Sequence, residues 1–153
     1  MPGVCFRLLS QAALALQTIH AAGLVHGHLQ NNLLVLTSDG VLKMCGLGEP
    51  SWLTASPHSE DAAADLAALG RIVSDCCSPQ AVRKGAKVKP LPQVLQNVLE
   101  RMQAADGYPS TTALLEDLDR ISSDIPPNQE AWDRLLRHVK DHAAPEAVLR
   151  QSA

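Results

Sequence analysis

Aromatic side chains are scarce in this 153-residue chain, where Phe, Trp and Tyr together make up 3% of the residues. The core must therefore be built from aliphatic side chains. Hydrophobic residues still reach 46%, which is enough for one domain to bury a core of its own. Segments rich in alanine and leucine favour helix. We expect a single, mostly helical domain.

An excess of basic charge is also missing, because 13 Lys and Arg face 16 Asp and Glu and leave a net charge of −3. A nucleic-acid-binding domain usually carries a basic surface, so we expect no nucleic-acid partner. No apolar run approaches the roughly 20 residues that cross a bilayer, and the N-terminus lacks the basic and apolar regions of a signal peptide. We therefore expect no membrane partner and a cytoplasmic location.

The four cysteines lack the C-x-x-C spacing that zinc and redox sites usually need. They are Cys5, Cys45, Cys76 and Cys77. In a reducing cytoplasm such cysteines stay as thiols. The sequence predicts reduced, partly buried cysteines.

Apolar residues recur at helical spacing in five segments, namely residues 4–22, 61–74, 92–104, 111–121 and 129–141. Gly23 fits the position after a helix C-terminus, and Ser110 and Asn128 fit N-caps. The segments 49–60 and 76–92 have the composition of loops.

A short hairpin is predicted between the first two helices. Leu33–Leu36 and Val41–Met44 are apolar runs separated by a turn that contains Asp-Gly, which is a strong hairpin signal. Antiparallel pairing then places the polar loop 26–32 beside Gly46-Leu47-Gly48.

Four segments in this order resemble the C-terminal lobe of a eukaryotic-type Ser/Thr protein kinase. The family's H-R-D-L-K-P-E-N, D-F-G, D-V-W-x-L-G and D-P-x-x-R-P-S motifs are similar to HGHLQNN at 26–32, LKMCGLG at 42–48, DLAALG at 65–70 and MQAADGYPS at 102–110. The resemblance implies a kinase C-lobe-like domain over residues 1–124 with the N-lobe absent. It leaves residues 125–153 as a C-terminal amphipathic helical extension.

The departures from these motifs fall on the catalytic positions. His28 stands where the family has its catalytic Asp, Gln30 replaces the catalytic-loop Lys, and Gly46 replaces the metal-holding Asp. Asn32 matches the metal-binding Asn only if the shorter loop has its gap just before that residue. Phosphoryl transfer needs bridging metal ions and a carboxylate that orients the nucleophile. We therefore expect no catalytic residues, no cofactor, no bound metal and no binding of ATP with Mg²⁺.

Two residues match structural positions of the family. His26 corresponds to its buried His, and Asp65 to the Asp that begins its central helix. The resemblance implies that Asp65 accepts hydrogen bonds from backbone N–H groups near His26 or Gly27. Tyr108 stands where the family has the Arg of an ion pair that links two of its motifs, so that pair is expected to be lost.

These observations favour a catalytically inactive pseudokinase C-lobe that acts as a protein-interaction or regulatory scaffold, with a protein partner that the sequence does not identify. One alternative is a Ser/Thr kinase part that needs another chain or a missing N-lobe. A second is an unrelated helical domain in which His26, His28 and Cys45 hold a soft metal, or in which Cys45 is a nucleophile with His28 as base and Glu49 nearby.

The last helix carries Trp132, Leu135, Leu136 and Val139 on one face. It either binds a partner or covers its own domain. Docking is favoured, because an exposed stripe that contains Trp promotes aggregation.

Overall fold

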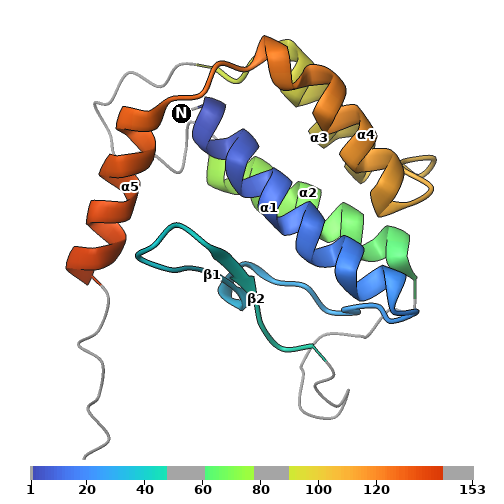
Figure 1. Cartoon of the computed structure of the whole chain (residues 1–153). Coiled ribbons are helices and arrows are strands. Elements are labelled where there is room, and N and C mark those ends of the chain that lie inside the picture. Colours follow the sequence, from blue (N-terminus) through green and yellow to red (C-terminus); the bar gives the residue numbers. More distant parts are fainter. Residues whose placement is uncertain (1, 48–60, 78–89, 143–153) are drawn as a thin grey trace, which may run out of the picture.

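The computed structural model describes residues 2–47, 61–77 and 90–142. Figure 1 shows a helical molecule with one small sheet. Its elements are α1 (Pro2–Ala21), η1 (Asn31–Leu33), β1 (Leu34–Leu36), β2 (Leu42–Met44), α2 (Ala62–Cys77), α3 (Gln93–Gln103), α4 (Thr111–Ile121), η4 (Ser122–Asp124) and α5 (Gln129–His142). The expected fold class, mostly helix with a short β-hairpin, is confirmed at this level.

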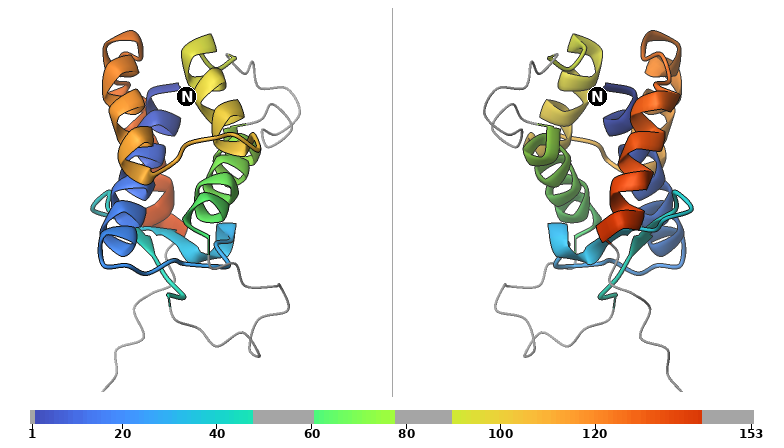
Figure 2. Two further views of the ribbon diagram at one scale, coloured as in Figure 1. Left: turned by 90° about the vertical axis from the view of Figure 1, so that its right-hand side faces the viewer. Right: turned by 90° about the vertical axis from the view of Figure 1, so that its left-hand side faces the viewer.

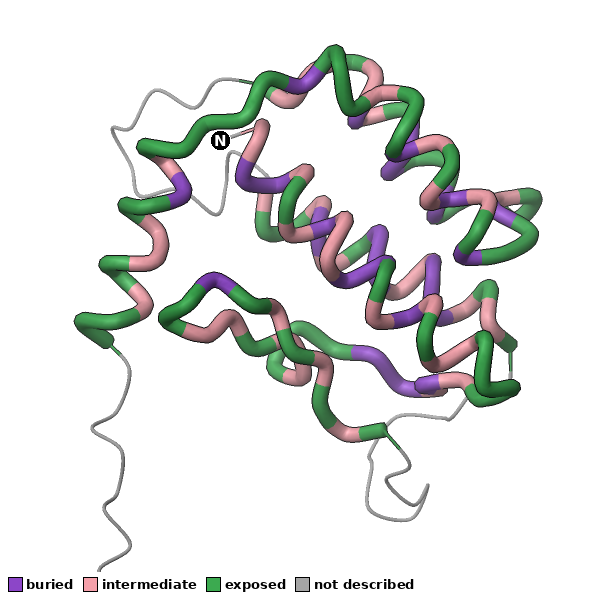
Figure 3. The backbone as a smooth tube through the Cα atoms, viewed as in Figure 1, coloured by how far each residue is buried: buried purple, intermediate pink, exposed green. Residues whose placement is uncertain are grey.

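The core is built around α1, which contacts α2, α4 and β2. Its apolar residues at helical spacing are fully buried, including Leu9, Ala13 and Leu16. The helices α1 and α2 lie side by side, and α3 and α4 form a second pair above them (Figures 1 and 2). Buried residues gather on the facing sides of these four helices, as Figure 3 shows.

Gly70 lets α2 approach α3 closely. A Cβ atom on this residue would lie only 2.8 Å from the Cβ of Met102 on α3. A larger residue would therefore fit only if one of the helices moved. Leu69 and Met102, both buried, fill the contact on either side. The D-L-A-A-L-G segment thus ends in a glycine for a packing reason.

The hairpin is antiparallel and pairs Leu34 with Met44 and Leu36 with Leu42. The alternating pattern leaves Val35 exposed while its neighbours in β1 face the helices. The amide side chain of Gln11, on α1, fastens the hairpin at its turn. Its Nε2 donates to the Gly40 carbonyl oxygen at 3.1 Å and its Oε1 accepts from the Leu42 N–H at 2.9 Å.

Helix α5 is docked on the same molecule, as the favoured alternative predicted. Trp132 is only 3% exposed, and the Arg7 guanidinium lies 4.1 Å from the centre of its ring. A Cβ atom on Gly40 would lie 3.3 Å from both Trp132 and Leu136. Gly40 has a positive φ of 86°, so its missing side chain serves both the turn and the approach of α5.

The prediction that all four cysteines stay reduced is wrong for two of them. Cys5 at the start of α1 and Cys77 at the end of α2 form a disulfide, while Cys45 and Cys76 are free and exposed. The two bonded cysteines are 72 residues apart in sequence, and only the packing of α1 against α2 brings them together. Cysteine spacing along the chain therefore could not reveal the pair.

Most predicted boundaries hold to within two residues, while α2 continues to Cys77, three residues beyond its predicted end. Ser110 and Asn128 cap α4 and α5 through bonds from Ala113 N–H and Ala131 N–H, and Gly23 has the predicted positive φ. The predicted loop 49–60 and most of 76–92 lie outside the described residues. None of the helices in the described segments is both long and apolar enough to cross a membrane.

Candidate functional site

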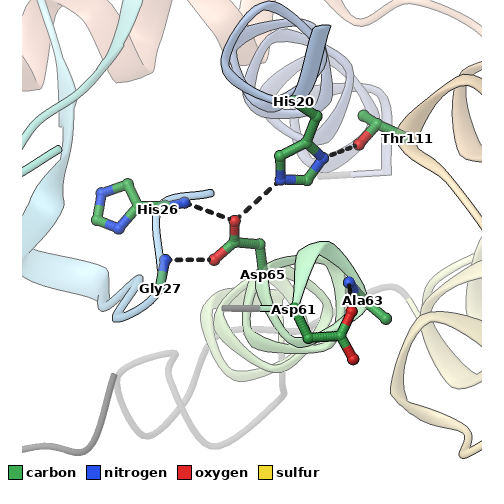
Figure 4. Close-up of polar contacts among 7 residues, drawn as sticks. All are labelled: His20, His26, Gly27, Asp61, Ala63, Asp65 and Thr111. Carbon is green, nitrogen blue, oxygen red and sulfur yellow. Dashed lines mark hydrogen bonds and ion pairs between the residues drawn. The ribbon is translucent and has the colours of Figure 1, made fainter. Parts of the chain in front are cut away.

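Asp65, in the first turn of α2, lies beside the loop that joins α1 to the hairpin (Figure 4). Its two carboxylate oxygens accept the backbone N–H groups of His26 at 2.8 Å and Gly27 at 2.9 Å. The side chain is almost completely buried. The predicted hydrogen bonds from this loop to Asp65 are thus confirmed.

His20 is a third donor to Asp65, and sequence reasoning missed it. Its Nε2 lies 2.9 Å from Asp65 Oδ2, and its Nδ1 lies 2.6 Å from Thr111 Oγ1. Because a carboxylate only accepts, Nε2 carries the proton, and in a neutral ring Nδ1 then accepts the Thr111 hydroxyl. One imidazole therefore links α1, α2 and α4. The available signal was a polar residue four positions after Leu16, on the apolar stripe of α1.

The His26 side chain joins the loop to the end of the hairpin. Its Nε2 donates to the Cys45 carbonyl oxygen at 2.8 Å, so the HGH segment lies beside the end of β2, as the hairpin geometry predicted; Gly48 of the predicted GLG turn lies outside the described residues. His26 is 2% exposed, and its Nδ1 has no hydrogen-bond partner among the described residues.

The four degenerate positions are spread over this loop and the end of β2. His28 is buried, with its ring 4.9 Å from that of His26. Gln30 and Asn32 are exposed, and the Asn32 N–H bonds to the side chain of Asn31. Gly46 has a positive φ of 79°.

The metal and nucleophile alternatives receive little support from this arrangement. The Cys45 group that faces His26 is its carbonyl, and the residue itself is exposed. Within residues 2–47, 61–77 and 90–142, no three His, Cys, Asp or Glu side chains gather as a metal would need. Glu49, the expected orienting carboxylate, lies outside the described residues.

Tyr108, which stands where the family has the Arg of an ion pair, contacts Asp117 and Arg101. This buried residue donates its hydroxyl to Asp117 at 2.7 Å, and Arg101 lies over its ring and also bonds to Asp117. Burial, followed by the bond to Asp117, raises the Tyr108 pKa. The same bond and two arginines, Arg101 and Arg120, hold the Asp117 pKa below its usual range.

The arrangement around Asp65 holds the loop between α1 and the hairpin in place. The carboxylate is already occupied by three donors, His20, His26 and Gly27. These three bonds tie the loop to α1 and α2. No protein-family model, curated protein or solved structure matches the chain.

Proposed function

We propose that this chain is a kinase C-lobe-like domain without catalytic apparatus, which acts as a protein-interaction or regulatory scaffold. The observation that carries the proposal is the bonding of Asp65 to the backbone of His26 and Gly27. It couples a D-L-A-A-L-G helix to an H-x-H loop in the way that the resemblance implies. In this proposal the chain keeps the fold around a catalytic loop, while the side chains that phosphoryl transfer needs are replaced.

The replaced groups are those on which phosphoryl transfer depends. His28 cannot supply the negative charge that orients a substrate hydroxyl, and Gly46 has no oxygen to hold a metal ion. Gln30 lacks the positive charge that would steady the transferred phosphoryl group. The loop therefore has a structural role, and the chain acts by binding a protein partner.

A surface suited to a protein partner lies between α1 and the hairpin turn. A groove of about 590 Å³ is bordered by Phe6 and Leu14 on α1, Val41 beside the turn and the start of α5. Leu14 and Val41 are 53% and 46% exposed. Exposed apolar side chains gathered at one groove are typical of interaction sites.

Charge placed in this groove should abolish partner binding. We expect the double variant Leu14→Glu/Val41→Glu to lose proteins that the wild-type chain captures, because a partner would have to bury both carboxylates. The measurement is quantitative mass spectrometry of captured proteins, followed by a binding titration with each purified candidate.

The matched control is Leu24→Glu, since Leu24 is also 53% exposed but does not border the groove. It should retain the same proteins with unchanged affinity. If no captured protein distinguishes the double variant from this control, the scaffold proposal for this surface is wrong.

A further inference from the structure

A second cavity lies on the other side of α1, between α1, α2, the hairpin and α5. It has a volume of about 240 Å³ and is lined by aliphatic side chains from all of these elements, including Leu8, Leu36, Leu42, Ile72, Leu135 and Val139. The described part of its lining contains no Asp, Glu, Lys, Arg or His. This composition is typical of sites that take uncharged apolar ligands.

The volume sets the size of the ligand. An apolar cavity of about 150 Å³ stays dry and binds benzene, so 240 Å³ has room for a molecule somewhat larger than a single aromatic ring. The polar groups of the lining are Asn31 and Cys76, both exposed. They lie at the solvent side and leave the interior apolar.

Helix α5 forms one wall of the cavity. Only Trp132 of this helix is buried, and Leu135 and Val139, which line the cavity, are half-buried. The helix joins the rest of the chain through Pro126 and Pro127, both exposed. A small displacement of its C-terminal half, with Trp132 as the anchor, would admit a ligand without disturbing the main core.

We propose that this cavity is a binding site for a small uncharged apolar molecule of one or two rings. The site is independent of the proposed scaffold function, because its lining shares no residue with the groove that holds Leu14 and Val41. The ligand class follows from the volume and from the uncharged lining, and α5 controls access.

The test uses indole as the probe and the full chain with ¹³C-labelled isoleucine δ1-methyl groups. Of the isoleucines, Ile72 lines the cavity, Ile125 lines the other groove, and Ile19 and Ile121 line neither. We expect a saturable chemical-shift change at Ile72 alone. Indole-3-carboxylate has the same ring with one added negative charge. It should leave the chemical shift of the Ile72 methyl group unchanged, because burying a carboxylate among aliphatic groups is costly.

Filling the cavity gives the matched mutational test. Val139→Phe should weaken indole binding by about tenfold or more, a loss of about 1.4 kcal/mol, while Val35→Phe, the same change at an exposed position outside both cavities, should leave it unaltered. No shift at Ile72, a larger shift at Ile125, equal binding of the carboxylate, or unchanged binding in Val139→Phe would each overturn the proposal.

Discussion

Asp65→Ala is expected to lower the free energy of unfolding by about 3–5 kcal/mol, because it leaves buried donors without an acceptor. The N–H groups of His26 and Gly27 and the ring N–H of His20 all bond to this carboxylate. At 1% exposure, Asp65 and the donors around it are shielded from bulk water. Urea denaturation measures the change, and the His26 and Gly27 amides should exchange faster with solvent.

Two variants separate this effect from the general loss of a charge. Asp65→Asn keeps one acceptor oxygen but turns an NH₂ group toward a donor, so we expect an intermediate loss. Asp119→Ala removes an exposed carboxylate from α4 and should change stability by less than about 0.5 kcal/mol. Equal effects of Asp65→Ala and Asp119→Ala would show that the loop does not depend on Asp65.

Reduction of the Cys5–Cys77 disulfide is expected to lower the free energy of unfolding by about 4 kcal/mol. The bond closes a segment with a sequence separation of 72 residues, and the stabilisation grows with the chain entropy that closure removes from the unfolded state. Denaturation with and without a thiol reductant measures the difference. Cys5→Ser should reproduce the loss and make the protein insensitive to the reductant.

Cys76→Ser is the control, since Cys76 is the free neighbour of the bonded Cys77. It should leave both stability and sensitivity to reductant unchanged. Desolvation by neighbouring atoms raises the pKa of the Cys76 thiol, and the Asp75 carboxylate adds to this effect. Little thiolate is therefore present at neutral pH to attack the disulfide. Reductant-independent stability of the wild-type chain would contradict the disulfide.

Local sequence signals account for most of the secondary structure. The helices follow from the spacing of apolar residues. The N-terminal ends of α4 and α5 follow from Ser110 and Asn128, because a capping side chain bonds a backbone N–H within three residues. The hairpin follows from Asp39-Gly40, where a positive φ favours glycine. Each of these interactions is encoded by neighbours along the chain.

The contacts that sequence reasoning missed join residues far apart. His20 meets residues 45 and 91 positions away, and Arg7 meets Trp132 across the molecule. Asp65 could be placed only through the family resemblance, since no local pattern links it to His26. Cys45, predicted to be partly buried, is exposed because the alternation of β2 places it on the same side as the exposed Lys43.

We propose that the loop 26–32 has kept the backbone anchor of a catalytic loop and lost the groups needed for phosphoryl transfer. Backbone amide NMR with Mn²⁺ and ATP tests it at the residues concerned, because bound Mn²⁺ broadens nearby signals and favours oxygen ligands. We predict no selective broadening of the amides in 26–33 and 44–47 relative to exposed amides of α4. Saturable broadening centred on His28 and Gly46, removed by a chelator, would contradict the proposed loss of metal and nucleotide binding. It would favour a kinase part that lacks its other lobe.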